Sequence, residues 1–589
     1  MIVRNEKNLS TKKCIIAGII AFCIVWLLAL LCGITWDEND DAFISKLLFN
    51  NKEMYYSPSQ PKILTYIIYT FNTNWPVCNW WTVFSVMAMA LGISSAVYVM
   101  FKKHKFIMAF VYSAIIIVCG WKIGISRINF TRTAAIISGG GAILIELAAC
   151  HAGNNKREKK WVSEFITGQI FLLIGCMFRR QCALLALAYI FALILISVLS
   201  NRETFFSTGL RQVKFIDELK KLAILAVAVN MVLVFILLNN LTLNPDEKEF
   251  VSYNSARAAI NDYPVVSFSE AEEEYKAVGF SENDLWLFEH WISEDTEFFS
   301  TDRLKSVGGI KKDESLSLKK VIYECMGSLY TICHKITTHV MCCITLISVG
   351  FIVILNRRKN LVKMAVLASL TILILLGLHY IGRCPDRVWE PVWYLFLISI
   401  LTAASDGHLE VKDSKMIYTI ILSVSALSVV FVAVNKNDKY TLWTESDRTY
   451  SNTFDYVDSH SENIYVYYPM SLGPVSAPYG INNPWVSYPI DYCNNLFELG
   501  GWNARMPNML DLRKDYGIEN LMKSLFEKDN VYVLTDNTET GNNSLHRILK
   551  FMHEHYEENI EMYVCDVSTD DVQIVQFRSP KAENAETSS

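Results

Sequence analysis

The sequence predicts a mainly α-helical protein that crosses a membrane about eleven times and carries a small extracytoplasmic α/β domain at its C-terminal end. Hydrophobic residues make up 52% of the 589 residues and charged residues only 19%, a balance typical of a polytopic membrane protein. Long apolar runs recur along the chain, and clusters of basic residues alternate with them. The net charge of −5 argues against a nucleic-acid partner.

The apolar runs set the number of expected spans. The run 163–199 is about twice as long as one crossing needs, and the polar stretch 178–181 interrupts it, so we expect two helices joined by a tight turn. No cleavage motif follows the first run, which we therefore interpret as an uncleaved anchor. Together with this helix pair, nine further runs make eleven spans: 14–35, 80–101, 106–122, 131–151, 222–241, 337–356, 361–381, 388–404 and 415–434.

Basic residues predict the orientation of these spans. Lysine and arginine gather in four alternate connections on the side of the basic N-terminus: 102–105, 156–160, 211–221 and 357–359. Because cytoplasmic loops are enriched in lysine and arginine, residues 1–13 are expected in the cytoplasm and the C-terminal segment outside. The resulting order is a transmembrane bundle over 14–241 with a first external loop at 36–79, an extracytoplasmic helical loop at 242–336, and a second bundle at 337–434.

The segment 435–580 has the pattern of a small extracytoplasmic α/β domain. Short runs rich in β-branched and aromatic residues predict strands, and helical periodicity predicts helices between them. The polar residues 581–589 are expected to be disordered. The expected strands lie at 463–468, 530–535, 561–566 and 572–577, and the expected helices at 518–526 and 544–556.

A cluster of carboxylates follows the first span. If a helix starts near Asn39, Asp40 shares a face with the apolar residues that follow it, while Glu38 and Lys46 point to water. Such a helix would lie at the membrane interface with Asp40 turned into the bundle. The four carboxylates are Asp37, Glu38, Asp40 and Asp41, and the apolar face comprises Phe43, Ile44, Leu47 and Leu48.

Asp40 is the candidate catalytic group of this cluster, with Asp37 and Asp41 as alternatives. A carboxylate held beside apolar surface is partly desolvated, which raises its pKa and suits a general base. A simpler explanation stays open, because aspartates also favour helix N-termini, where they cap free backbone N–H groups and complement the helix dipole.

Three short external turns each carry a pair of arginines at the level of the membrane, where the positive-inside rule predicts few. Arginine is suited to bidentate binding of phosphate, so the set predicts a lipid-phosphate site at the outer edge of the bundle. The alternative is that these guanidinium groups neutralise nearby acids such as Asp386 or Glu390, or reach lipid headgroups. The pairs are Arg127 with Arg132, Arg179 with Arg180, and Arg383 with Arg387.

The acidic first loop, the many spans and the C-terminal external domain together resemble the GT-C class of membrane glycosyltransferases. The stretches 39–48, 129–135 and 497–502 also resemble bacterial membrane proteins of this general shape. The resemblance implies a catalytic acid in the first external loop, carried over here to Asp40 with Asp37 and Asp41 as competitors. It further implies a lipid-linked sugar donor in the outer leaflet and a multi-pass location in a bacterial cell membrane.

One aromatic residue and two histidines are further candidates for the site. Trp502 is a candidate for stacking on a sugar ring, although an aromatic residue in a small domain commonly belongs to its core. His339 and His379 lie near the outer ends of two spans, yet the chain has no spacing of histidines and acids typical of a metal site. No metal and no cofactor are therefore expected.

The leading functional hypothesis is transfer of a sugar from a polyprenyl-phosphate lipid in the outer leaflet to an envelope glycan or glycolipid acceptor. A carboxylate would deprotonate the acceptor hydroxyl, and arginines would stabilise the phosphate as it leaves. A polysaccharide polymerase or ligase would use related chemistry. A transporter or flippase of envelope lipids and a non-enzymatic assembly protein are the alternatives from other classes.

Overall fold

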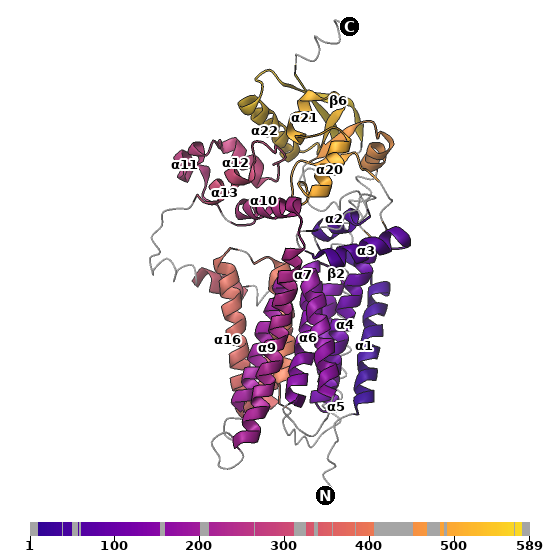
Figure 1. Cartoon of the computed structure of the whole chain (residues 1–589), viewed down its shortest axis with the longest axis vertical. Helices are drawn as coiled ribbons and strands as arrows, with labels where there is room; N and C mark the ends of the chain where they lie inside the picture. The colour runs from indigo at the N-terminus through magenta and orange to yellow at the C-terminus, as the bar shows by residue number, and fades with distance from the viewer. Residues whose placement is uncertain are drawn as a thin grey trace.

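A long helical bundle carries a second body on one of its ends (Figure 1). This soluble body comprises the described residues of the loop segment 245–310 and of the C-terminal segment 435–580. Helix α1 (Thr11–Leu31) belongs to the bundle, whereas α22 (Glu539–His555) lies in the soluble body. The predicted mainly α-helical membrane protein with a small C-terminal sheet is confirmed. The computed structural model describes residues 10–37, 39–49, 57, 60–152, 160–200, 211–263, 265–310, 326–334, 340–355, 357–382, 384–405, 452–467, 483–487, 492–569 and 572–579.

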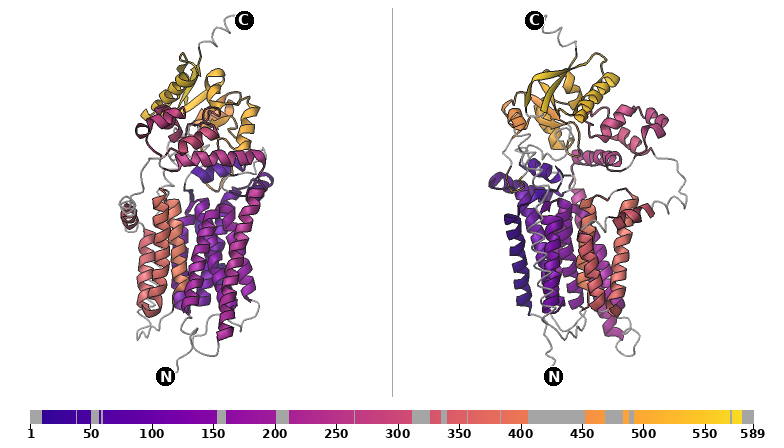
Figure 2. Two further views of the ribbon diagram at one scale, coloured as in Figure 1. Left: turned by 60° about the vertical axis from the view of Figure 1, so that its left-hand side comes forward. Right: turned by 180° about the vertical axis from the view of Figure 1, so that it is seen from behind.

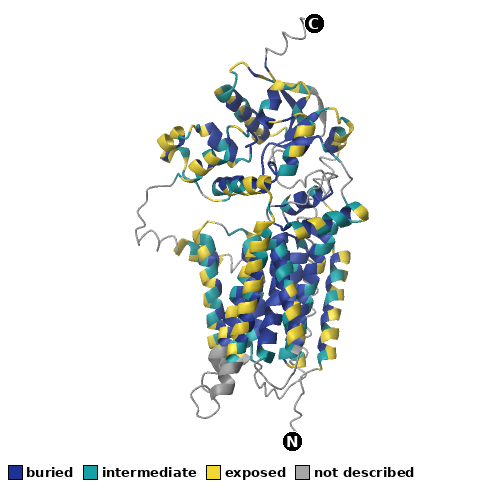
Figure 3. Ribbon diagram, viewed as in Figure 1, coloured by how far each residue is buried: buried dark blue, intermediate teal, exposed yellow. Residues whose placement is uncertain are grey.

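Seven helices among the described residues are long and apolar enough to cross a membrane. The central one is α6, in which 94% of the apolar window is buried, whereas the corresponding share is 28% in α1 and 22% in both α9 and α16. Figure 3 shows this difference as buried residues in the central helices and exposed residues along the outer helices. The helices are α1 (Thr11–Leu31), α4 (Trp80–Lys103), α5 (Phe106–Gly120) with the π-helical turn Trp121–Ile125 that continues it, α6 (Phe130–Ala152), α7 (Lys160–Ser200), α9 (Arg211–Leu241) and α16 (Arg357–Tyr380).

Glycines let the neighbours of α6 approach it closely. A methyl group added at Gly141 would lie 2.6 Å from the backbone oxygen of Gly168 in α7, and one at Gly140 would lie 2.5 Å from that of Gly92 in α4. Such contacts are too short for a side chain, so helix packing accounts for the glycine run 139–141.

Helix α7 reverses direction at Arg179, whose φ of −159° and ψ of 109° are those of an extended residue. Glu164 near its start lies 2.6 Å from the ring of His151, and Ser197 near its end accepts a hydrogen bond of 3.2 Å from Lys221. Both contacts lie at the free end of the bundle, where α6 ends and α9 begins (Figures 1 and 2). The turn predicted within 163–199 is therefore present.

The predicted number of eleven spans stays a prediction, because length and composition select seven helices among the described residues. Two further helices, α15 (Val340–Leu355) and α17 (Asp386–Ala403), coincide with the runs 337–356 and 388–404. The run 415–434 lies outside the described residues, as do the tail 581–589 and most of the N-terminal segment 1–13.

A layer of short elements separates the bundle from the soluble body. Strand β1 (Thr35–Trp36) pairs in parallel with β2 (Arg127–Ile128), and the helices α2 (Asn39–Leu47) and α3 (Lys62–Asn74) lie across the end of the bundle. The predicted helix start at Asn39 and the burial of Phe43, Ile44 and Leu48 are confirmed.

The predicted exposure of Lys46 is wrong. Its side chain is only 6% exposed, and its ammonium group donates a hydrogen bond to the backbone oxygen of Tyr492 in the C-terminal domain. The helical pattern placed Lys46 opposite the apolar face, but that opposite face is covered by the soluble body rather than by water. Glu38 lies outside the described residues.

The loop after α9 and the C-terminal segment form one soluble body rather than two separate pieces. Arg513 donates to Glu294 at 2.6 Å, and the backbone N–H of Ser293 donates to the oxygen of Leu499 at 2.7 Å. One apolar core contains residues of both segments. The loop contributes α10 (Pro245–Asn261), α11 (Glu272–Ala277), α12 (Glu282–Glu289) and α13 (Thr301–Gly308).

The C-terminal segment contains a five-stranded sheet of order β4-β3-β5-β7-β6, in which β4, β3 and β5 are parallel. All four predicted strands and both predicted helices are present. The short β4 was not predicted because three residues give too little alternation to detect. The elements are β3 (Ile464–Tyr467), β4 (Leu496–Glu498), α20 (Pro507–Asp515), α21 (Leu521–Glu527), β5 (Val531–Asp536), α22 (Glu539–His555), β6 (Glu561–Thr569) and β7 (Val572–Arg578).

Glu498, at the end of β4, should make the stability of the protein depend on pH. Burial raises the pKa of Glu498 to about 8 from an ordinary value of 4.5, although the hydroxyl of Tyr467 donates to it at 2.8 Å. Its stabilising effect is therefore complete below pH 4.5 and is lost as the pH rises towards 8. We expect the Tm of the wild type to fall over this interval, and Glu498→Gln to flatten the fall.

Thermal unfolding of the detergent-solubilised protein at several pH values measures this effect. The matched control is Glu519→Gln, because Glu519 is exposed in the same domain and should leave the pH dependence unchanged. Identical slopes for wild type and Glu498→Gln would contradict the assignment.

Candidate functional site

The acidic first loop lies where the bundle, α2 and the soluble body meet. The ladder between β1 and β2 extends by one hydrogen bond, from the backbone N–H of Asp37 to the oxygen of Ile128 at 3.0 Å. This pairing brings the loop after α1 beside the loop that precedes α6. The predicted acids at 37–41 and the predicted arginines at 127 and 132 are thus neighbours.

Asp37 belongs to a buried ion-pair cluster with Glu390, Arg127 and Arg132. Arg132 is completely buried and lies 2.8 Å from Asp37 and 2.7 Å from Glu390. Arg127 is 22% exposed and lies 3.6 Å and 3.0 Å from the same two acids. Two acids therefore face two arginines, which matches the alternative that these arginines neutralise neighbouring acids.

Asp41 is completely buried and holds the start of α6. One carboxylate oxygen accepts a hydrogen bond of 3.0 Å from the indole of Trp81, and the other accepts one of 3.2 Å from the backbone N–H of Phe130. Burial raises the pKa of Asp41 well above its ordinary value, and the charge of Asp40 adds to this effect. Asp41 thus has the contacts of a structural residue.

Among the described carboxylates of the cluster, Asp40 is the one that combines side-chain contacts with solvent access. Its side chain is 28% exposed, accepts a hydrogen bond of 3.0 Å from the indole of Trp502, and lies 3.4 Å from Arg387. Burial raises the pKa of Asp40, whereas the hydrogen bond from Trp502 and the charge of Arg179 lower it. This is the environment that the apolar face of α2 predicts for a base.

The sequence predicted that Asp40 faces into the bundle. In the structure its side-chain partners come from both the bundle and the C-terminal domain. Arg387 belongs to α17 of the bundle, whereas Trp502 belongs to the C-terminal domain. Asp40 therefore faces the junction between bundle and soluble body.

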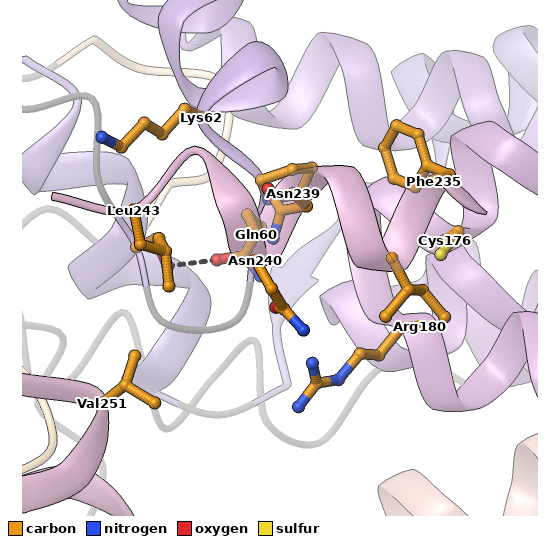
Figure 4. A pocket seen from close by; sticks show the side chains of 12 residues that line it. Gln60, Lys62, Cys176, Arg180, Phe235, Asn239, Asn240, Leu243 and Val251 are labelled. Atoms are coloured by element: carbon orange, nitrogen blue, oxygen red, sulfur yellow. Dashed lines mark hydrogen bonds between the residues drawn. The ribbon is translucent and has the colours of Figure 1, made fainter. Parts of the chain in front are cut away.

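Arg179 and Arg180 at the turn of α7 point in different directions, because the backbone of Arg179 is extended. Arg179 donates to the hydroxyl of Thr131 at 2.9 Å and stacks over the ring of Phe130 at 5.1 Å, on the side of Asp40. Arg180 points to a pocket between α3, α7 and α9 (Figure 4). Arg383 lies outside the described residues.

The pocket at Arg180 combines polar groups with an apolar floor. Arg180 is exposed, and among the described residues no carboxylate pairs with it. Figure 4 shows its guanidinium group reaching towards the side chain of Asn240. Polar groups come from Gln60, Lys62, Asn239 and Asn240, and apolar groups from Cys176, Phe235, Ile236, Leu243 and Val251.

Lys62, the second cation of this pocket, has an ion-pair partner. Its ammonium group lies 2.6 Å from Glu247 at the start of α10, which links the pocket to the soluble body. Arg180 therefore carries the unneutralised charge of the pocket. A lipid phosphate requires this combination, because its headgroup is anionic and its chain is apolar.

Sequence inspection could not find Trp81, which lies inside a predicted span and has no local pattern that indicates its partner. Glu390 was predicted only as one of several acids that could neutralise the arginines. Trp502 was predicted as a sugar-stacking residue, and the structure adds that its indole N–H is bound to Asp40. Trp485 of the C-terminal segment packs on Trp26 of α1 with ring centres 6.2 Å apart.

Three solved structures are similar to this chain over most of its length. ArnT from Cupriavidus metallidurans bound to undecaprenyl phosphate has 10% identity and a TM-score of 0.39, with 96% of this chain and 98% of that chain covered. Its apo state has 11% identity, a TM-score of 0.36 and the same coverage. The apo oligosaccharyltransferase of Archaeoglobus fulgidus has 12% identity and a TM-score of 0.39, with 91% and 71% covered.

Similarity at this level does not assign a role to any residue of this chain. No protein-family model matches the sequence, and no curated protein matches it. The organisation implied by the GT-C resemblance is nevertheless present in the chain itself, as a helical membrane bundle with an acidic first loop and a C-terminal domain beside it.

Proposed function

We propose that this chain transfers a sugar from a polyprenyl-phosphate lipid to a cell-envelope acceptor, with Asp40 as the general base. The observation that carries the proposal is the contrast among the three aspartates. Asp37 is neutralised in an ion-pair cluster, Asp41 is sealed, and Asp40 keeps solvent access beside two cationic groups. The soluble body and the acceptor lie on the extracytoplasmic side in this proposal.

The proposed chemistry assigns one role to each part of the site. Asp40 accepts the proton of an acceptor hydroxyl while that oxygen forms a bond to the anomeric carbon of the sugar. The bond from this carbon to the lipid phosphate breaks, and the phosphate leaves with the electron pair. Arg179 and Arg387, which surround Asp40, are placed to stabilise the negative charge that develops on the phosphate.

The pocket at Arg180 is the proposed binding site for the headgroup of polyprenyl phosphate without its sugar. Arg179 and Arg387, in contrast, act on the phosphate during transfer. We expect Arg180→Ala to weaken binding of polyprenyl phosphate by about 10- to 150-fold, because a hydrogen bond to a charged group contributes about 1.5–3 kcal/mol. Binding is measured with purified protein, with the uncharged polyprenol as a comparison ligand. Asp40→Asn should bind the lipid as well as the wild type does.

The matched control for this experiment is Lys13→Ala. Lys13 is an exposed cation at the other end of the bundle, so it tests for unspecific attraction between the protein and an anionic lipid. Equal affinities for the phosphate and for polyprenol, or an unchanged affinity in Arg180→Ala, would contradict a phosphate site here. A transporter or an assembly protein would then become the better explanation of the fold.

Substitution of Trp502 should change the pH profile of sugar transfer. Its hydrogen bond lowers the pKa of Asp40, so Trp502→Phe should raise this pKa while it keeps an aromatic ring. A base acts in its deprotonated form, and the rising limb of activity should therefore move to higher pH in the variant. Initial rates measured across pH test this, and an unmoved limb would show that Asp40 does not titrate as the base.

A further inference from the structure

Asp284, Glu554 and His555 meet between α12 and α22 of the soluble body. One ligand atom from each residue lies within 4.8 Å of the other two. Asp284 belongs to the loop between the two halves of the bundle, and the other two residues belong to the C-terminal domain. About 270 residues of chain separate them, which is why sequence spacing predicted no metal site.

The charge balance at Asp284 points to a cation. Asp284 is 0% exposed, and its one ion-pair partner among the described residues is His555, at 2.9 Å. The neighbouring Glu554 has an exposed partner, Lys550, at 3.6 Å. An imidazole carries a charge only when it is protonated, so no permanently charged side chain pairs with Asp284 itself. Burying a carboxylate is costly unless a cation pairs with it, and a bound divalent cation would offset that cost.

The ligand atoms are held in place by surrounding contacts. The second oxygen of Asp284 accepts the backbone N–H of Ser281 at 2.7 Å, and the hydroxyl of Ser281 donates to Glu554 at 3.0 Å. The ring of His555 packs against Phe298 and Phe551, with ring centres 4.2 Å and 4.6 Å apart. These contacts orient all three groups before any ion arrives, as metal ligands require.

We propose that Asp284, Glu554 and His555 bind a divalent transition-metal cation such as Zn²⁺, with water completing its coordination. One imidazole nitrogen and two carboxylate oxygens suit Zn²⁺, which takes nitrogen and oxygen ligands in a four-coordinate shell. The cation joins α12 to α22 and fixes the loop 242–336 on the C-terminal domain. The site is remote from the chemistry proposed for Asp40, and it stands independently of that proposal.

Metal titration of the chelator-treated, full-length protein tests the site. Zn²⁺ should bind and raise the Tm, whereas His555→Gln should bind at least about tenfold more weakly, because even residues behind the ligands are worth about 10–100-fold in metal affinity. His553→Gln is the matched control, since His553 lies on the same helix and its ring contacts the backbone oxygen of Ile560 instead. It should bind like the wild type.

Co²⁺ in place of Zn²⁺ separates this site from the cysteines of the chain. The expected visible spectrum has the bands of nitrogen and oxygen ligands, without the charge-transfer bands of thiolates. Asp284→Asn provides a second variant, which keeps the shape of the side chain and should also lose the spectrum. Zn²⁺ affinity unchanged in His555→Gln and Asp284→Asn, or a thiolate spectrum alone, would overturn the proposal.

Discussion

Asp40→Asn is expected to reduce sugar transfer by about 10²- to 10⁴-fold, which is the range that general acid–base groups contribute. Asparagine has nearly the same shape and can still accept the hydrogen bond from Trp502, but it cannot take up the proton of the acceptor. The fold should survive, because the Asp40 side chain is 28% exposed and is not part of the buried ion-pair cluster. Transfer from a polyprenyl-phosphate sugar to an acceptor, together with the Tm, measures both effects.

Asp41→Asn is the matched control for this prediction. It makes the same chemical change at the neighbouring residue, whose two oxygens are bound to Trp81 and the backbone of Phe130. Because burial already favours the neutral form of Asp41, the variant should keep most of its activity and lose some stability. The opposite outcome, with Asp41→Asn inactive and Asp40→Asn active, would transfer the role of base to Asp41.

The sequence predicted the position of this acid from the pattern of one helix. The apolar face of α2 is buried, and Asp40 lies beside it as the periodicity requires. The choice among the three aspartates needed the structure, since it depends on partners 40, 89 and 462 residues away. Such distances leave no trace in the local pattern.

The six predicted arginines illustrate the same limit. The five described arginines gather at the end of the bundle that carries the soluble body, and the positive-inside rule singled these residues out because arginines outside the basic connections are unusual. Their division into neutralised and unneutralised groups was not. Arg127 and Arg132 face acids, whereas Arg180 faces a pocket, and the cause is the extended backbone of Arg179 together with Glu390 from a distant helix.

The soluble body was predicted as two pieces because each piece has its own helical or strand pattern. Its union depends on a shared apolar core and on Arg513, whose partner Glu294 is 219 residues away. Arg505 of the same domain lies 3.5 Å from Glu294 and donates to the backbone oxygens of Ser293 and Phe299. The sequence pattern predicts the helices and strands, whereas the union of the two segments depends on these tertiary contacts.

Arg132→Met is expected to destabilise the protein by about 3–5 kcal/mol, the cost of breaking a buried ion pair by removing one partner. The cluster contains two acids and two arginines, and Arg132 is its completely buried member. Its removal leaves Asp37 and Glu390 with Arg127 alone, and thus an excess negative charge in a place that water does not reach. A large drop in Tm and in resistance to denaturant should follow.

The double variant Arg132→Met/Glu390→Gln distinguishes a charge effect from a packing effect. It removes one charge of each sign and leaves Asp37 paired with Arg127, so its loss of stability should be smaller than the sum of the losses in Arg132→Met and Glu390→Gln, by about 0.5–3 kcal/mol. Arg127→Gln serves as the control, since Arg127 is 22% exposed and water can replace part of its contact. If the double variant were as unstable as the sum of both single variants, the buried charges would not be coupled. The cluster would then hold β1, β2 and α17 together by shape alone.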